Sequence, residues 1–113
     1  MVSVCMATYN GEKYIHRQLV SILNQIDFDD EVIISDDSST DNTLSIVKQF
    51  DDHRIQVFTN QGVSGPVGNF ESALFRASGD YIILADQDDF WLPKKVDLVK
   101  SLLQDNDLLL SDC

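Results

Sequence analysis

Three aspartates, Asp86, Asp88 and Asp89, lie within four positions of one another in the segment ADQDDFWLP at residues 85–93. In an extended segment side chains alternate, so Asp86 and Asp88 would share one side at about 6.5–7 Å along the backbone. Carboxylates at such a short distance repel each other unless a cation or hydrogen bonds intervene. Mg²⁺ or Mn²⁺ would relieve the repulsion, since both prefer oxygen ligands and keep positions for water and substrate phosphates.

The same aspartates also suit a structural role. Aspartate is favoured in turns and at the first position of a helix, and a helical pattern follows this segment after Pro93. Phe90 and Trp91 are then predicted to anchor that helix in the core. The spacing alone leaves both interpretations open.

A second acidic cluster lies in IISDDSSTDNT, residues 33–43. Ser, Thr and Asp in this pattern are typical of a helix N-terminus. Asp36 and Asp37, however, stand at the tip of the preceding apolar run, where a carboxylate can accept hydrogen bonds from a base N–H or a ribose hydroxyl. Tyr9 and Asn10 follow the first apolar run, and they fit either a turn or, for the tyrosine, a surface on which a base stacks.

Apolar runs and helical spacing predict the elements that must position these residues. Continuous apolar or β-branched runs predict strands at 2–7, 31–35, 55–59 and 81–85, with a fifth beginning at 107–111. Apolar residues at helical spacing predict helices from Glu12 to Gln25, over 44–50, over 70–77 and after Pro93. The Gly-rich segment NQGVSGPVG is predicted to be a connection whose backbone N–H groups could touch phosphate.

Strands that are apolar throughout and alternate with helices indicate a mostly parallel sheet covered on both faces. We therefore predict an open α/β sandwich made of one domain, residues 1–113. Ligands bind such sheets at the carboxyl ends of the strands. Polar residues follow three of the predicted strands at that edge: Thr8, Tyr9, Asn10, Asp36, Asp37, Asp86, Asp88 and Asp89.

Composition excludes several classes of protein. The formal net charge of −11 argues against binding nucleic acid, which requires clustered Lys and Arg. No run approaches the roughly 18 apolar residues of a membrane span, and the N-terminus is unlike a signal peptide. Cys5 and Cys113 show no metal-site spacing, so we expect an intracellular chain with Cys5 as a buried apolar residue, and we expect His16 and His53 at the surface.

Four motifs together resemble the family 2 glycosyltransferases, which have the GT-A fold, an α/β/α sandwich with a mostly parallel sheet. They are ATYNGEKYI, IISDDSSTDNT, GNFESALFRASGDYI and ADQDDFWLP, and they occur in the family's order over nearly all 113 residues. The DQDDFW variant is most similar to the rhamnosyltransferase-like branch.

The resemblance implies roles for individual residues. Asp86 and Asp88 match the ends of the family's DxD motif, which implies that Asp88 contacts Mg²⁺ or Mn²⁺ and that Asp86 contacts the ribose or a metal-bound water. Asp37 matches an aspartate that contacts uracil, with Asp36 beside it, and Ala7 and Tyr9 match positions that line the base. The donor-binding set implied in this way also includes Thr8, Asn10 and Asn69.

The resemblance further implies an activity. It is the metal-dependent, inverting transfer of a sugar from a UDP- or dTDP-linked donor to a glycan or lipid-linked acceptor, in cell-surface polysaccharide synthesis. Family members are more than twice as long, so we expect an incomplete amino-terminal part, inactive alone, with the general base beyond residue 113. We expect a cytoplasmic location, at the inner face of the membrane for the full-length protein.

One departure and two alternatives stand beside this interpretation. Many relatives carry an Arg before the Asn of the third helix, where this sequence has Gly68, so the resemblance supplies no basic contact there. A phosphoacceptor module also gathers acidic residues at strand ends, although here the first strand ends in TYN and the third in TN. A nucleotide-binding protein without transferase activity is the other alternative.

Overall fold

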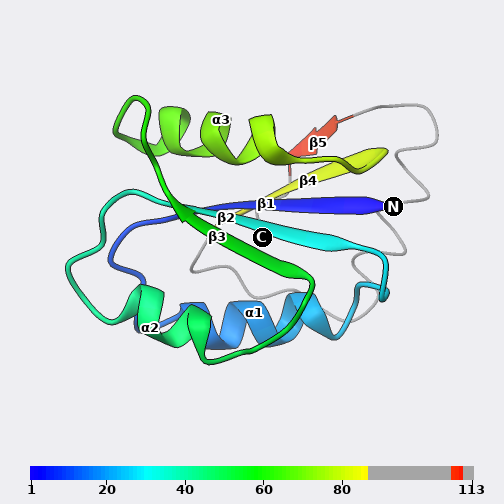
Figure 1. The fold of residues 1–113 in the computed structure, drawn as a ribbon, viewed down its shortest axis with the longest axis horizontal. Coiled ribbons are helices and arrows are strands. Elements are labelled where there is room, and N and C mark those ends of the chain that lie inside the picture. The colour runs from blue at the N-terminus through cyan, green and yellow to red at the C-terminus, as the bar shows by residue number, and fades with distance from the viewer. Residues whose placement is uncertain (87–107, 111–113) are drawn as a thin grey trace.

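The computed structural model describes residues 1–86 and 108–110, which form a sheet with helices on both faces (Figure 1). The strands are β1 (Val2–Thr8), β2 (Glu31–Asp36), β3 (Ile55–Thr59), β4 (Tyr81–Asp86) and β5 (Leu108–Leu110). The helices are α1 (Ile15–Leu23), α2 (Thr43–Lys48) and α3 (Pro66–Arg76).

The sheet has the strand order β3-β2-β1-β4-β5, and each of these neighbouring pairs is parallel. The chain winds outward from β1 to β3 and then crosses through α3 to β4 on the other side of β1. The order therefore reverses between β1 and β4, and a crevice for ligands is expected at such a point. The predicted parallel α/β sheet is confirmed.

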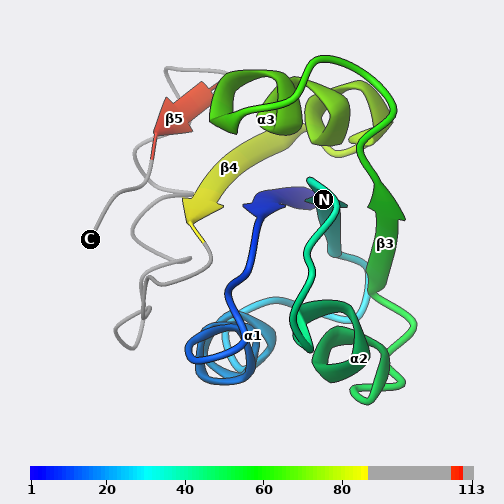
Figure 2. The same cartoon turned by 90° about the vertical axis from the view of Figure 1, so that its left-hand side faces the viewer.

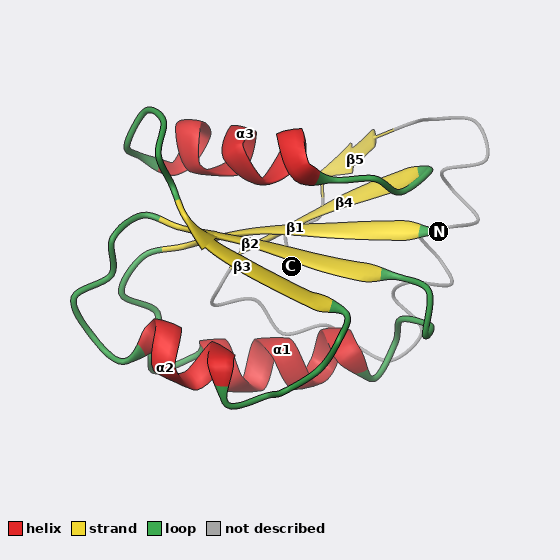
Figure 3. Cartoon of the chain, viewed as in Figure 1, coloured by secondary structure: helices red, strands yellow, loops and turns green. Residues whose placement is uncertain are grey.

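The helices divide between the two faces of the sheet (Figures 2 and 3): α1 and α2 cover one face and α3 the other. Alternate residues of the strands supply the two cores. Val4 and Met6 of β1 belong to the larger core, which includes Ile15 and Leu19 of α1. Cys5 belongs to the smaller core, as predicted for a buried cysteine, and burial followed by the charge of Glu31 raises its pKa to about 12.

The helices begin and end differently from the periodic patterns. Helix α1 starts at Ile15 instead of Glu12, because the backbone and side chain of Glu12 bond to the loop after β2. Helix α2 ends at Lys48, and Phe50 packs against the larger core from beyond the helix. The helix predicted after Pro93 lies outside the described residues.

Helix α3 packs on the smaller core, and Leu74 of its predicted span lies against that core. Its buried residues are Gly68, Asn69 and Ala73, whereas Phe70 and Leu74 are half-buried. Small residues let this helix lie close to its neighbours. Across the described part of the chain, no helix combines the length and the apolar character needed to cross a bilayer.

Arg54 fastens the end of α1 to the start of β3. Its Nη1 donates to the carbonyl oxygens of Leu23 and Ile26 at 3.2 and 3.0 Å, and its Nη2 lies 2.8 Å from Oδ2 of Asp52. The hydrogen bond from Arg54 is the largest cause that lowers the pKa of Asp52 to about 2. The ionised carboxylate is therefore stabilised by folding.

This lowered pKa predicts how stability depends on pH. The ionised form of Asp52 contributes above the ordinary pKa of 3.8, and the contribution is lost as the pH falls through about 2. We expect Asp52→Asn to lower the free energy of unfolding by about 2 kcal/mol at pH 7, with the difference shrinking below pH 4. Denaturant titrations at pH 7 and at a pH below 4 measure this difference in the free energy of unfolding. The exposed Asp29→Asn is the control, and equal stability of the two variants at pH 7 would contradict the prediction.

Candidate functional site

The carboxyl ends of the parallel strands form one edge of the sheet, which faces the viewer in Figure 2. Most of the residues that the sequence singles out lie there. Thr8, Tyr9 and Asn10 end or follow β1, Asp36 and Asp37 end or follow β2, and Asp86 ends β4. Asn69 reaches this edge from α3.

Thr8 and Asp36 form a buried pair beneath the edge. Their exposed fractions are 1% and 0%, and Oγ1 of Thr8 donates to Oδ1 of Asp36 at 2.6 Å. Ser39 donates to the same carboxylate from its hydroxyl at 2.7 Å and from its backbone N–H at 2.8 Å. Asp36 thus joins the tips of β1 and β2 to the loop that follows β2.

Asn69 ties α3 to the same two strands. It is 2% exposed, its Oδ1 accepts from Oγ of Ser35 at 2.6 Å, and its Nδ2 donates to the carbonyl oxygen of Thr8 at 3.2 Å. Both ends of the amide are directed at the sheet. Thr8, Asp36 and Asn69, which the sequence groups with the donor contacts, therefore lie together as a support under the edge.

The Asp37 carboxylate lies above this support and is half-buried. Its Oδ2 accepts from the backbone N–H of Gly65 at 2.9 Å, and Nδ2 of Asn60 lies 3.4 Å from its Oδ1. Asn60 directly follows β3, and the sequence alone predicts no role for its side chain. Its position before a Gly-containing turn is the one sequence signal that could have drawn attention to it.

The loops after β1 and β2 are joined by hydrogen bonds. Asn10, at φ 48°, donates its backbone N–H to Oγ of Ser39 at 2.9 Å, and its Oδ1 accepts from the N–H of Thr40 at 2.8 Å. Gly11 adds a bond from its N–H to Oγ1 of Thr43 at 2.8 Å. The Tyr9 side chain, 55% exposed, projects from the start of these joined loops.

The end of β4 lies beside β1 at the point where the strand order reverses. Ala7, half-buried, is in register with Asp86 on one side and with Ser35 on the other. Asp88 and Asp89 lie outside the described residues. Within the part that the structure describes, no three side chains of His, Cys, Asp or Glu gather as a metal site, so the predicted Asp86–Asp88 site stays a prediction.

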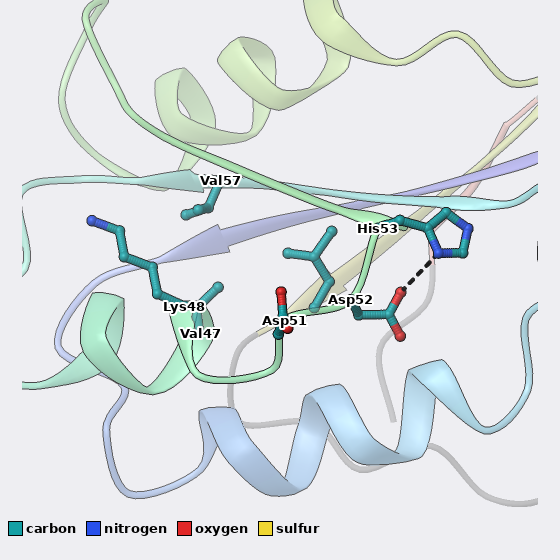
Figure 4. Close-up of a pocket in the computed structure, with 7 residues that line it drawn as sticks. Val47, Lys48, Asp51, Asp52, His53 and Val57 are labelled. Carbon is teal, nitrogen blue, oxygen red and sulfur yellow. Dashed lines mark ion pairs between the residues drawn. The ribbon is translucent and has the colours of Figure 1, made fainter.

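A separate hollow of about 350 Å³ lies between the end of α2 and β3, away from this edge (Figure 4). Val47 and Val57 line it together with the charged Lys48 and Asp51. His53 is exposed, as is His16, in agreement with the sequence, and its Nδ1 lies 3.9 Å from Oδ1 of Asp52. None of the predicted site residues that the structure describes lines this hollow.

Comparisons with known proteins show which family this chain is similar to. The family model described as glycosyl transferase family 2 matches residues 3–111. A UDP-Glc:α-D-GlcNAc-diphosphoundecaprenol β-1,3-glucosyltransferase of Escherichia coli is 36% identical over 96% of this chain and 43% of its own length. A dTDP-rhamnosyl transferase of Shigella flexneri is 41% identical over 80% of this chain and 34% of its own length.

The fold is also found in solved structures. A mannosyltransferase from Pyrobaculum calidifontis, in complex with GDP-Man and Mn²⁺, has a TM-score of 0.82 and 26% identity, over 93% of this chain and 32% of that one. This likeness confirms the predicted GT-A architecture. The chain spans less than half the length of these curated relatives.

The buried pair predicts that Thr8 is needed for stability. Thr8→Val keeps the shape but leaves Oδ1 of Asp36 without one donor, so we expect the free energy of unfolding to fall by about 1–3 kcal/mol. Thr59→Val, at the exposed end of β3, is the matched control and should change it by less than about 0.5 kcal/mol. Chemical denaturation measures both, and a Thr8→Val variant as stable as the control would contradict the prediction.

Proposed function

The chain belongs to glycosyltransferase family 2, and from this premise we propose that it is the donor-binding part of an enzyme that transfers a sugar from a nucleotide diphosphate-sugar to a lipid-linked glycan acceptor. The product would serve cell-surface polysaccharide synthesis. The family match favours this function over that of a phosphoacceptor module. A protein that only binds nucleotide would lack the transfer step.

The placement of Tyr9 and Asp37 carries the proposal. An exposed aromatic ring and a half-buried carboxylate stand at the carboxyl edge, next to the strand that ends in Asp86. A ring can stack on a base, and an ionised carboxylate is an acceptor that requires an N–H or O–H from its ligand. In this proposal Tyr9 stacks on the base, Asp37 accepts from its N–H, and Ala7 and Asn10 border the same space.

The relatives support a pyrimidine donor. One is named for UDP-Glc and another for dTDP-rhamnosyl transfer. Uracil and thymine share an N–H between two carbonyl groups, which suits an acceptor such as Asp37. We therefore propose a UDP- or dTDP-linked sugar.

We propose that Asp86 and Asp88 hold Mg²⁺ or Mn²⁺. Two carboxylates at the end of a strand are a suitable set of hard oxygen donors, and the backbone places Asp86 beside β1 at the reversal of strand order. A related mannosyltransferase structure contains Mn²⁺. When bound, the cation would stabilise the negative charge that develops on the departing diphosphate.

The acceptor side completes the proposal. The E. coli relative is named for an acceptor attached to diphosphoundecaprenol. For this chain we propose a lipid-linked acceptor as well, with transfer at the cytoplasmic face of the membrane. An inverting transfer requires a carboxylate base that takes the proton of the acceptor hydroxyl. We assign that base to none of the described residues.

The metal assignment is tested by calorimetry on the full-length protein. We expect UDP or dTDP to bind in the presence of Mn²⁺ and to bind about tenfold more weakly without it, because a cation held by Asp86 and Asp88 would offset the repulsion between these carboxylates and the diphosphate. Asp88→Asn should weaken the Mn²⁺-dependent binding similarly. Asp80→Asn, on the exposed side chain that pairs with the N-terminus, is the control. Equal affinities with and without Mn²⁺ would refute the metal site.

The base contact is tested through Tyr9. Tyr9→Ala should weaken binding of the same nucleotide by roughly tenfold, since stacking on an aromatic ring contributes about 1–3 kcal/mol per base. Phe75→Ala is the control, because this 88% exposed ring lies near the C-terminal end of α3, whereas the helix begins near the carboxyl edge of the sheet. Competition binding with a fluorescent nucleotide measures both variants, and a Tyr9→Ala affinity equal to that of Phe75→Ala would exclude the stacking role.

A further inference from the structure

Asn60 organises the loop between β3 and α3 with its whole side chain. Its Oδ1 accepts from the N–H of Gly62 at 2.9 Å and from Oγ of Ser72 at 2.6 Å. Its Nδ2 donates to the carbonyl oxygen of Val63 at 2.9 Å and lies 3.4 Å from Oδ1 of Asp37. One amide thus connects its own loop, helix α3 and the carboxylate at the tip of β2.

Gly68 allows this loop to lie directly on the helix. The residue is buried, and a Cβ built on it would lie 2.1 Å from the carbonyl oxygen of Val63 and 2.9 Å from the carbonyl carbon. Backbone atoms at that distance must move, so no other residue fits the present loop. Gly65, at φ 104°, has a backbone conformation that side chains disfavour, and Pro66 begins the helix after it.

The folded loop delivers two donors to Asp37. The N–H of Gly65 bonds to Oδ2 at 2.9 Å, and the Asn60 amide faces Oδ1. Two donors on different oxygens fix the plane of the carboxylate. A carboxylate has about four acceptor positions and these donors occupy two of them, so the group keeps its capacity to accept from a ligand.

We propose that Asn60 and Gly68 are positioning residues for the donor base, because they fold residues 60–65 into the shape that holds the Asp37 carboxylate ready for the base N–H. This inference rests on the proposed function, in which Asp37 contacts the base. It adds that recognition of the base depends on residues 60–65, a loop to which we assign no direct contact with the base. An aspartate without these donors would have to be ordered by the ligand, which reduces affinity.

The test compares a nucleotide with its N3-methyl analogue, which lacks the N–H. With Mn²⁺ present, we expect the full-length wild-type protein to bind UDP or dTDP about tenfold more tightly than the analogue, as for one hydrogen bond to a charged group. Asn60→Asp keeps the oxygen acceptor but places a carboxylate opposite Asp37. We expect it to reduce the preference to about twofold or less. Gln61→Asp adds the same charge at an exposed neighbouring position and should retain the wild-type preference for the nucleotide over its analogue.

Gly68→Ala gives an independent variant, because it displaces the loop at Val63 without changing a group that touches Asp37. We expect the same loss of preference, with thermal unfolding measured to verify that each variant is folded. If Asn60→Asp is unfolded, Gly68→Ala decides. Wild-type preference retained in a folded Asn60→Asp or Gly68→Ala variant overturns the inference and leaves the proposed function intact. A wild-type protein that binds neither UDP nor dTDP overturns both the inference and the proposed function.

Discussion

The carboxylate of Asp36 is the group on which the rest of the edge depends. It is 0% exposed, and its hydrogen-bond partners in the described structure are the hydroxyls of Thr8 and Ser39 and one backbone N–H. A buried charge costs free energy unless its hydrogen bonds are made, so these partners must stay in place. Because they come from β1 and from the loop after β2, satisfying one carboxylate also fixes where Tyr9 and Asp37 emerge from the sheet.

The edge is therefore built in two levels. Thr8, Asp36 and Asn69 lie below and bind one another or the strands, while Tyr9 and Asp37 lie above with surface exposed to a ligand. Loops held by several hydrogen bonds lose little further freedom when a ligand binds. The lower level thus explains how residues on three separate loops and one helix can act as a single binding surface, as the proposed function requires.

The sequence predicted the parallel sheet well because strands buried on both faces are apolar throughout, as in β1 and β2. It did not predict which polar residues are buried. Thr8 and Asp36 are 28 positions apart and Thr8 and Asn69 are 61 apart, so their pairing follows from the folded sheet and not from local spacing. Asn60 stayed unnoticed for the same reason, since its partners include Ser72 and Asp37. The Asp86–Asp88 pair lies at the boundary of the described residues, and its role is still predicted from sequence.

Charge gives this arrangement a functional reason. The chain carries a net charge of −11, yet the proposed ligand is an anionic diphosphate. The donors that orient the carboxylates at the edge are neutral hydroxyls, amides and backbone N–H groups. Neutral donors can orient a base and a carboxylate but cannot offset the repulsion between the protein and a diphosphate. In the proposed function that task falls to a divalent cation, so base recognition and phosphate binding depend on different parts of the same edge.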